Sequence, residues 1–288
     1  MKRKPTSHSY YSQRLRLHYL DWGNPQAPHM LLVHGVHDHC HTWDWFASEF
    51  ADDYHIVALD LRGHGDSEWV RGSSYHHVDY VYDIAQLVRQ AELEPAVVVG
   101  HSMGGTLAAL YAGLYPEQVS KLVLLEGIGL WTGDLEDSSP AERIRVWIDN
   151  TRQLAGRLPK RYPTLESALA RMRDANAHLN DEQVRHLTAH GSNQNEDGTF
   201  SWKYDNYTHA FPVYRILADE TIGIWREITS PSLILNASEG FSHRIGHNGT
   251  CDYFRDCLMI DIAEAGHWIH HDQLDEVVVA TRNFLAQT

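Results

Sequence analysis

Ser102 lies at the centre of a Gly-x-Ser-x-Gly pattern, between a β-branched run at 96–99 and a helix-like stretch at 106–115. In this context the pattern predicts a nucleophile elbow, a tight turn that strains its central residue and leaves no space for a Cβ two positions away. Gly100 and Gly104 meet that requirement. The N-terminus of the following helix would favour developing negative charge. Ser102 is therefore predicted to be a nucleophile that attacks a carbonyl carbon.

A serine hydroxyl needs a nearby base, because it is a weak nucleophile at neutral pH. Three histidines, His267, His270 and His271, follow the last apolar run of the chain at 258–262. His267 comes directly after Ala-Gly, so we expect it on a loop at the carboxyl edge of the sheet. His270 and His271 are expected at the start of the next helix. His267 is therefore predicted to be the general base.

A catalytic histidine also needs an acid that holds its ring in the correct tautomer and stabilises its cation. Glu126 directly follows the apolar run 121–125, and Glu239 lies in the loop after the run 231–235. Catalytic groups gather at the carboxyl ends of strands in open parallel sheets, whereas Glu239 also fits a solvated loop charge. The sequence favours Glu126 and leaves Glu239 as the alternative.

Backbone N–H groups are expected to bind the oxyanion that forms during attack on a carbonyl. One would come from Met103, directly after the nucleophile, and the other from Val36, directly after His34-Gly35. Neither side chain is needed for this role. His34 is interpreted as a residue that organises the loop and not as a second base.

Apolar runs alternate with helical patterns through the first part of the chain, which predicts an α/β fold with a sheet wrapped by helices. The segment 131–226 lacks strong β runs and is predicted to be a helical cap inserted into the sheet. The α/β core would then comprise 1–130 and 227–288. Strands are predicted at 14–22, 29–33, 54–59, 96–99, 121–125, 231–235 and 257–262, and helices at 75–92, 106–115, 140–154, 164–179 and 273–285.

Composition excludes several classes of partner. The 288 residues carry 24 basic and 38 acidic side chains, a net charge of −14, which opposes binding to nucleic acid or anionic lipid. The basic N-terminus is not followed by an apolar stretch, so we expect a cytoplasmic protein with no membrane span. Three cysteines without a Cys-x-x-Cys pair are expected to be reduced thiols.

Two further patterns resemble ligand sites but do not fit them. The histidines of His37-Asp38-His39 and His41 lack the spacing of a structural zinc site and are interpreted as the rim of a loop. Gly127-x-Gly129 lacks the rest of a dinucleotide fingerprint. The sequence therefore predicts neither a metal nor a cofactor.

The chain resembles the α/β-hydrolase superfamily through motifs that span its whole core: His34-Gly35, Trp43, the run from Asp60 to Ser67, the elbow around Ser102, and Ala265-Gly266-His267. The resemblance looks closest to the serine-hydrolase-like branch with a helical cap. It implies a mostly parallel eight-stranded sheet, a lid between the sixth and seventh crossovers, and acyl-enzyme chemistry without a cofactor.

The sequence departs from the family pattern at the acid, because the usual aspartate after the seventh strand would fall near Gly240. Relatives that resemble haloalkane dehalogenases carry the acid after the sixth strand, and Leu125-Glu126-Gly127 matches that placement. Dehalogenases and epoxide hydrolases of this fold use an aspartate at the elbow. Ser102 therefore favours acyl transfer to water over either of those reactions.

Together these residues predict hydrolysis of an ester, thioester or related acyl bond in a small, apolar substrate. The alternative from another class is a ligand-binding or receptor protein that keeps the hydrolase shell with slow or no turnover. The sequence leaves open the substrate, which cap shape decides, and the oligomeric state.

Overall fold

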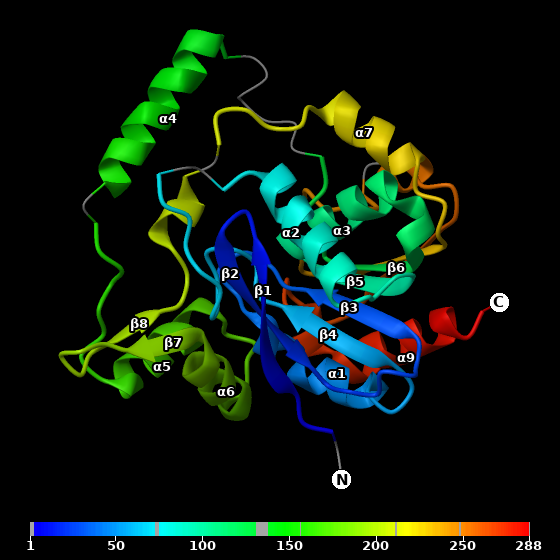
Figure 1. Cartoon of the computed structure of the whole chain (residues 1–288), viewed down its shortest axis with the longest axis horizontal. Helices are drawn as coiled ribbons and strands as arrows, with labels where there is room; N and C mark the ends of the chain where they lie inside the picture. Colours follow the sequence, from blue (N-terminus) through cyan, green and yellow to red (C-terminus); the bar gives the residue numbers. More distant parts are fainter. Residues whose placement is uncertain are drawn as a thin grey trace.

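The protein is built on one eight-stranded sheet, seen in a computed structural model that describes residues 3–72, 75–130, 138–155, 157–210, 212–247 and 249–287 (Figure 1). The strand order is β1-β2-β4-β3-β5-β6-β9-β10. β2 pairs antiparallel with β1 and β4, and the other neighbours are parallel. The strands are β1 Thr6–Ser12, β2 Leu15–Asp21, β3 His29–Val33, β4 His55–Leu59, β5 Ala96–His101, β6 Val119–Leu125, β9 Ser232–Ala237 and β10 Cys257–Ile262. The predicted α/β-hydrolase fold is confirmed.

Helices cover both faces of the sheet because its inner strands are apolar on both sides. Every residue of β4, β5 and β9 is buried. α1 (Asp44–Phe50) and α9 (Leu274–Leu285) pack on one face, and α2 (His77–Gln90) and α3 (Met103–Leu114) pack on the other (Figure 1). Short helices lie at η1 Cys40–Trp43, η2 Pro116–Gln118, η4 Thr250–Tyr253 and α8 Ile269–Asp272. Within the described residues, no helix is both long and apolar enough to cross a membrane.

The edge strand β1 did not emerge from the sequence. Its segment is rich in serine and tyrosine and contains no apolar run, and five of its seven residues are exposed. β1 forms a hairpin with β2 through Gln13 and Arg14, which both have positive φ angles of 46° and 70°. A two-residue hairpin turn favours such angles because they match the twist of the strands. The expected early strand at 14–22 is therefore the second half of a hairpin.

The segment between β6 and β9 is mainly helical, as expected, but it also contains a small hairpin (Figure 1). Its elements are α4 Pro140–Leu154, α5 Leu165–Ala175, α6 Asp181–Gly191, β7 Ser192–Gln194, β8 Phe200–Trp202, η3 Asn206–His209 and α7 Ala218–Arg226. The expected cap boundary at residue 131 lies outside the described residues. α7 packs against α3 and buries Trp225 in the core. The last helix of the predicted cap therefore contacts the α/β domain directly.

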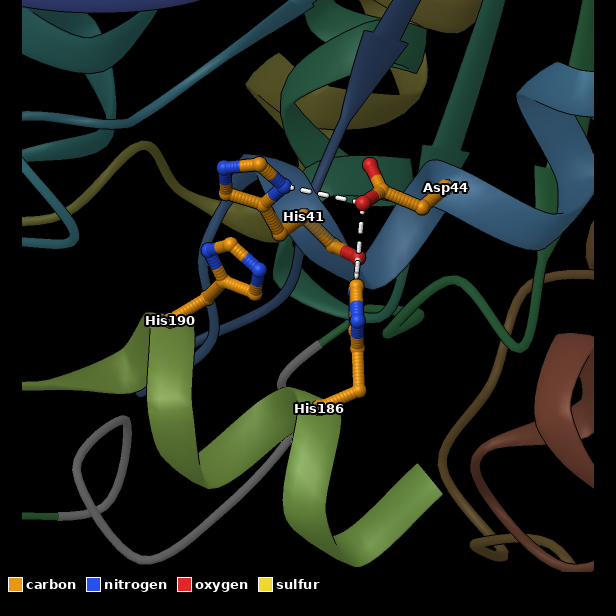
Figure 2. Close-up of side chains that lie close together, drawn as sticks. All are labelled: His41, Asp44, His186 and His190. Atoms are coloured by element: carbon orange, nitrogen blue, oxygen red, sulfur yellow. Dashed lines mark hydrogen bonds and ion pairs between the residues drawn. The ribbon is translucent and has the colours of Figure 1, made fainter. Parts of the chain in front are cut away.

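α5 and α6 form a small apolar cluster of their own that meets the core. The buried members are Leu169, Leu179, Val184 and Leu187, and Trp45 and Trp268 of the core pack against them. α6 also lies next to η1 and the start of α1, with two of its histidines facing that segment (Figure 2). α6 is therefore the element of the insertion that rests on the core beside the loop carrying His267.

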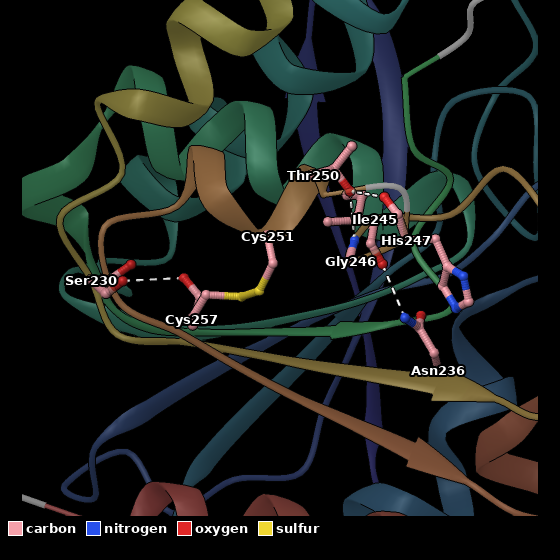
Figure 3. Close-up of a disulfide and its surroundings, with 9 residues drawn as sticks. Ser230, Asn236, Ile245, Gly246, His247, Thr250, Cys251 and Cys257 are labelled. Atoms are coloured by element: carbon pink, nitrogen blue, oxygen red, sulfur yellow. Dashed lines mark hydrogen bonds between the residues drawn. A yellow bond between two sulfur atoms is a disulfide. The ribbon is translucent and has the colours of Figure 1, made fainter.

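Two of the three cysteines are paired, so the expectation of reduced thiols is wrong for them. Cys251 in η4 and Cys257 at the start of β10 form a disulfide (Figure 3). Their Cα atoms are 6.2 Å apart, within the range that a disulfide spans. The turn that joins η4 to β10 brings them together, which cysteine spacing alone does not indicate. Cys40 is free and buried. Disulfides persist mainly in oxidising compartments, so cysteine usage no longer supports the predicted cytoplasmic location.

Candidate active site

Ser102 occupies a strained turn between β5 and α3. Its φ and ψ angles are 55° and −124°, a conformation that non-glycine residues rarely adopt. A Cβ added to Gly100 would overlap the carbonyl oxygen of Gly104, and one added to Gly104 would overlap that of Val33. The turn is held by its neighbours, since Ser102 N donates to Leu125 O at 3.0 Å. The two glycines are therefore required for the bend, as the sequence pattern indicated.

His267 lies on the loop between β10 and α8, with its ring directed at the serine. Its Nε2 atom is 2.8 Å from Ser102 Oγ, which is hydrogen-bond distance. The loop is fixed from two sides, because Asp272 Oδ2 accepts a bond from Gly266 N at 2.8 Å and His101 Nε2 donates to His267 O at 2.8 Å. The Phe241 ring lies 4.1 Å from the imidazole, centroid to centroid. The base is thus held by its backbone and leaves both ring nitrogens for other partners.

Glu126 is fully buried at the end of β6 and reaches the other side of the same imidazole. Its Oε2 atom lies 3.3 Å from His267 Nδ1. Its Oε1 atom accepts a hydrogen bond from Ala237 N at 2.6 Å and lies 3.1 Å from Arg244 Nη1. The hydrogen bond from Ala237 and the positive charge of Arg244 offset the cost of burying a carboxylate. A Cβ on Gly240 would overlap Oε2, so the acid also depends on that glycine.

The alternative acid Glu239 lies elsewhere. It is exposed in the loop after β9, where Glu239 N donates to Ala265 O at 2.9 Å. His270 and His271 are buried on α8 and both contact Thr42 Oγ1 instead of the serine. The structure therefore brings together Ser102, His267 and Glu126 and leaves the other candidates out.

Three residues near this site were not predicted from the sequence to have a role in it. Arg244 and Gly240 come from the loop after β9, and both lie beside the carboxylate of Glu126. Their proximity to Glu126 depends on the fold and cannot be read from the sequence. His101 precedes the nucleophile, and burial lowers its pKa well below the ordinary value. A neutral ring donates one N–H, which His101 directs at the carbonyl of His267. Its position inside the elbow pattern was the one feature that could have drawn attention to it.

The loop after β3 passes directly beside the nucleophile. A Cβ on Gly35 would lie 3.0 Å from Ser102 Cβ, so this glycine allows the close approach. His34 accepts a bond from Leu61 N at 3.0 Å and donates to Gly35 O at 2.6 Å. Burial lowers the pKa of His34 to about 3, consistent with a neutral ring that organises the loop. Within the described chain, the N–H groups of Val36 and Met103 have no hydrogen-bond acceptor.

Several histidine-containing groups could offer ligands to a metal. In the described part of the chain, three groups place their ligand atoms within 4.8 Å of one another. Two are buried: His18 with Cys40 and Asp60, and Asp38 with His101 and His270. The third is partly exposed and consists of His41, Asp44, His186 and His190. Of the histidines at 37, 39 and 41, only His41 belongs to a group with partly exposed members.

A family model described as the alpha/beta hydrolase fold matches residues 28–274. The chain belongs to this family. A serine hydrolase-like protein of Danio rerio is 27% identical over 224 residues, which cover 76% of this chain and 68% of that protein. Epoxide hydrolase 4 of Mus musculus is 36% identical over 112 residues, which cover 38% of this chain and only 31% of that protein.

Among solved structures, a thioesterase domain from the curacin biosynthetic pathway superposes with a TM-score of 0.83. The alignment covers 98% of this chain and all of that domain, at 20% identity. Such identity shows a shared fold and no more. The family match and the epoxide hydrolase support an α/β-hydrolase enzyme, and the similarity to the serine hydrolase-like protein supports the serine-hydrolase-like branch.

Proposed function

We propose that this chain hydrolyses an ester, thioester or related acyl bond through an acyl-enzyme on Ser102. The observation that carries the proposal is the continuous hydrogen-bonded series from Ser102 Oγ to His267 Nε2, at 2.8 Å, and from His267 Nδ1 to Glu126 Oε2, at 3.3 Å. A nucleophile, a base and an acid that orients the base are the three parts that serine acyl transfer needs.

In the first half of the reaction, Ser102 Oγ attacks the carbonyl carbon while His267 Nε2 takes its proton. The negative oxygen of the tetrahedral intermediate accepts hydrogen bonds from the N–H groups of Val36 and Met103. Glu126 stabilises the imidazolium. His267 then returns the proton to the leaving group, and the acyl group stays on Ser102.

In the second half, His267 takes a proton from water, and the resulting hydroxide attacks the acyl-enzyme carbonyl. The same two N–H groups bind the second oxyanion, and Ser102 Oγ leaves as it recovers its proton. No cofactor enters either half. Arg244 supports both halves indirectly, since its guanidinium lies beside the buried Glu126 and offsets the cost of keeping that carboxylate charged.

The proposed substrate is small and apolar around its acyl group. A narrow cleft at the junction of insertion and core is lined on its apolar side by Met172, Leu187, Trp202, Tyr204 and Trp268. His37 lines the same cleft and follows Val36, while Trp268 follows His267. Residues next in sequence to the oxyanion loop and to the base therefore line this cleft, whose volume of about 20 Å³ would have to enlarge to admit an acyl chain. Apolar and aromatic walls favour such a chain.

The similarity to an epoxide hydrolase does not favour epoxide opening here. In this fold that reaction resembles dehalogenation in its use of an aspartate nucleophile, whereas this chain has Ser102 at the elbow. Attack of the serine oxygen on an acyl carbon gives an ester that water cleaves, whereas its attack on an epoxide would give an ether that water does not readily cleave.

The test uses a fluorophosphonate probe together with a panel of p-nitrophenyl esters of increasing chain length. Wild type should be labelled at one serine and should turn over short esters, and Ser102→Ala should lose both. Ser238→Ala is the matched control, because Ser238 is exposed in the loop beside Glu239 and should leave labelling unchanged. A wild-type protein that binds esters but is neither labelled nor active would favour the receptor alternative.

A further inference from the structure

Four ligand-type side chains meet where α6 rests on the core, apart from the triad. His41 lies in η1 and Asp44 begins α1, while His186 and His190 lie one turn apart on the same face of α6 (Figure 2). One ligand atom from each lies within 4.8 Å of all the others. The cluster thus takes two side chains from the core and two from the insertion.

The carboxylate of Asp44 already gathers two of the imidazoles. Its Oδ2 atom accepts from His41 Nδ1 at 2.9 Å and lies 3.1 Å from His186 Nε2, which also contacts the carbonyl oxygen of His41 at 3.2 Å (Figure 2). Its other oxygen, Oδ1, is buried without a hydrogen-bond partner in the described chain. The His190 ring stacks on that of His41, with centroids 3.7 Å apart. A buried carboxylate oxygen without a donor is unusual, so the hydrogen-bonding needs of Asp44 are only partly met in the described chain.

We propose that His41, Asp44, His186 and His190 bind one divalent transition-metal ion, such as Zn²⁺, that joins the helical insertion to the core. Imidazole nitrogens with one carboxylate suit Zn²⁺, Co²⁺, Ni²⁺ and Cu²⁺, whereas Mg²⁺ and Ca²⁺ prefer oxygen ligands throughout. The set of three nitrogens and one oxygen therefore selects the class of metal.

The geometry needs only small adjustments to close around such an ion. Zinc binds nitrogen and oxygen ligands at about 2.1 Å, so tetrahedral ligands lie about 3.4 Å from one another. The four ligand atoms now lie within 4.8 Å. Side-chain movements that shift these atoms by roughly 1 Å would bring them to ligand distance, and the ion would replace the proton between His41 and Asp44.

The cluster is also open to solvent, as metal entry requires. The side chains of His41, Asp44 and His186 are 19%, 22% and 24% exposed. None of the four is a member of the triad, so metal binding and acyl chemistry can be measured separately. Sequence spacing alone could not reveal this site, because 145 residues separate His41 from His186.

The test is calorimetric titration of the chelator-treated protein with ZnCl2 and, separately, MgCl2. Wild type should bind one Zn²⁺ per chain and no Mg²⁺. His186→Asn with His190→Asn, and separately Asp44→Asn, should weaken zinc binding by at least about tenfold. His8→Asn with His76→Asn is the control, since it also removes two histidines but lies outside the cluster, and it should bind zinc as wild type does.

Thermal unfolding gives a second readout that does not depend on activity. At a Zn²⁺ concentration about 100 times its Kd, the wild-type Tm should rise by about 5 °C, and the double variant should show no such rise. Circular dichroism of each variant without metal shows whether it is folded. Absence of saturable zinc binding in wild type would overturn the proposal, as would equal zinc affinity in wild type and both folded cluster variants.

Discussion

Replacing Glu126 by glutamine tests whether the buried acid orients His267. Glutamine has the same shape, but its amide has one acceptor and one donor. The Oε1 position faces Ala237 N at 2.6 Å and Arg244 Nη1 at 3.1 Å, so the amide oxygen must stay there. The NH2 group then faces His267 Nδ1 in place of Oε2. This forces the ring to accept at Nδ1 and to carry its proton on Nε2.

A proton on Nε2 prevents the ring from accepting the proton of Ser102 Oγ, 2.8 Å away. The wrong tautomer in a serine protease triad reduces kcat by about 10⁴. We expect a loss of about 10³ to 10⁴ in kcat for Glu126→Gln, or about 4 to 5.5 kcal/mol of transition-state stabilisation. The assay is steady-state turnover of a short p-nitrophenyl ester, corrected for the fraction of protein that is folded.

Glu239→Gln is the matched control, because it makes the same chemical change in an exposed loop on the same edge of the sheet. It should keep kcat within about twofold. Glu126→Gln also leaves Arg244 beside a neutral group, and breaking a buried ion pair costs about 3 to 5 kcal/mol of stability, so thermal unfolding of each variant is needed. A folded Glu126→Gln variant that keeps more than about a tenth of kcat would refute the reasoning, as would an equal loss in Glu239→Gln.

Two further predictions concern stability. Gly223 lies in the interior of α7, where an added Cβ meets nothing within 4 Å, so Gly223→Ala should raise the free energy of unfolding by about 0.5 to 1 kcal/mol. Gly104→Ala should lower the free energy of unfolding by about 3 kcal/mol or more, because its Cβ would overlap Val33 O. Urea unfolding measures both, and equal effects would contradict the close packing of the elbow. Burial lowers the pKa of several histidines, seven of them to about 3 or 4, so between those values and about 6.5 the unfolded chain binds more protons and stability falls with falling pH, by about 1.4 kcal/mol per pH unit for each uncompensated ring. The folded pKa is about 3 for His34, His37 and His271 and about 4 for His39, His64, His77 and His190. The opposing groups, whose pKa values are raised in the folded chain, are fewer: Asp38 (to about 7), Asp83, Asp272 and His186. A Tm at about pH 5 that equals or exceeds that at about pH 7.5 would contradict the expected fall in stability.

The sequence predicted the core of the fold because apolar runs and turn glycines are local signals. The elbow is an example, since the conformation of Ser102 is set by glycines within two residues of it. The loop position of His267 followed in the same way from the end of an apolar run. β1 escaped prediction because an edge strand with polar side chains has no apolar pattern to detect.

The choice between the two acids needed coordinates. Glu126 and Glu239 both follow apolar strands, and the difference between them is that one is fully buried beside Arg244 while the other is exposed. Burial and pairing of that kind depend on the path of the loop after β9, which spacing does not encode. The disulfide between Cys251 and Cys257 depends on the same loop. The prediction of the acid and of the disulfide was therefore limited by the unknown path of this loop, and not by the residue types.

α6 connects the insertion to both sides of the proposed site. Gln183 Nε2 donates to the carbonyl of His271, on the short helix that follows the proposed base, at 3.0 Å. The carbonyl of Leu187 contacts His39 Nε2 at 3.0 Å, on the segment that follows the oxyanion loop. Displacement of α6 would break both bonds. Because His186 lies between Gln183 and Leu187 on the same helix, a metal bound there would resist that displacement without touching the reacting atoms.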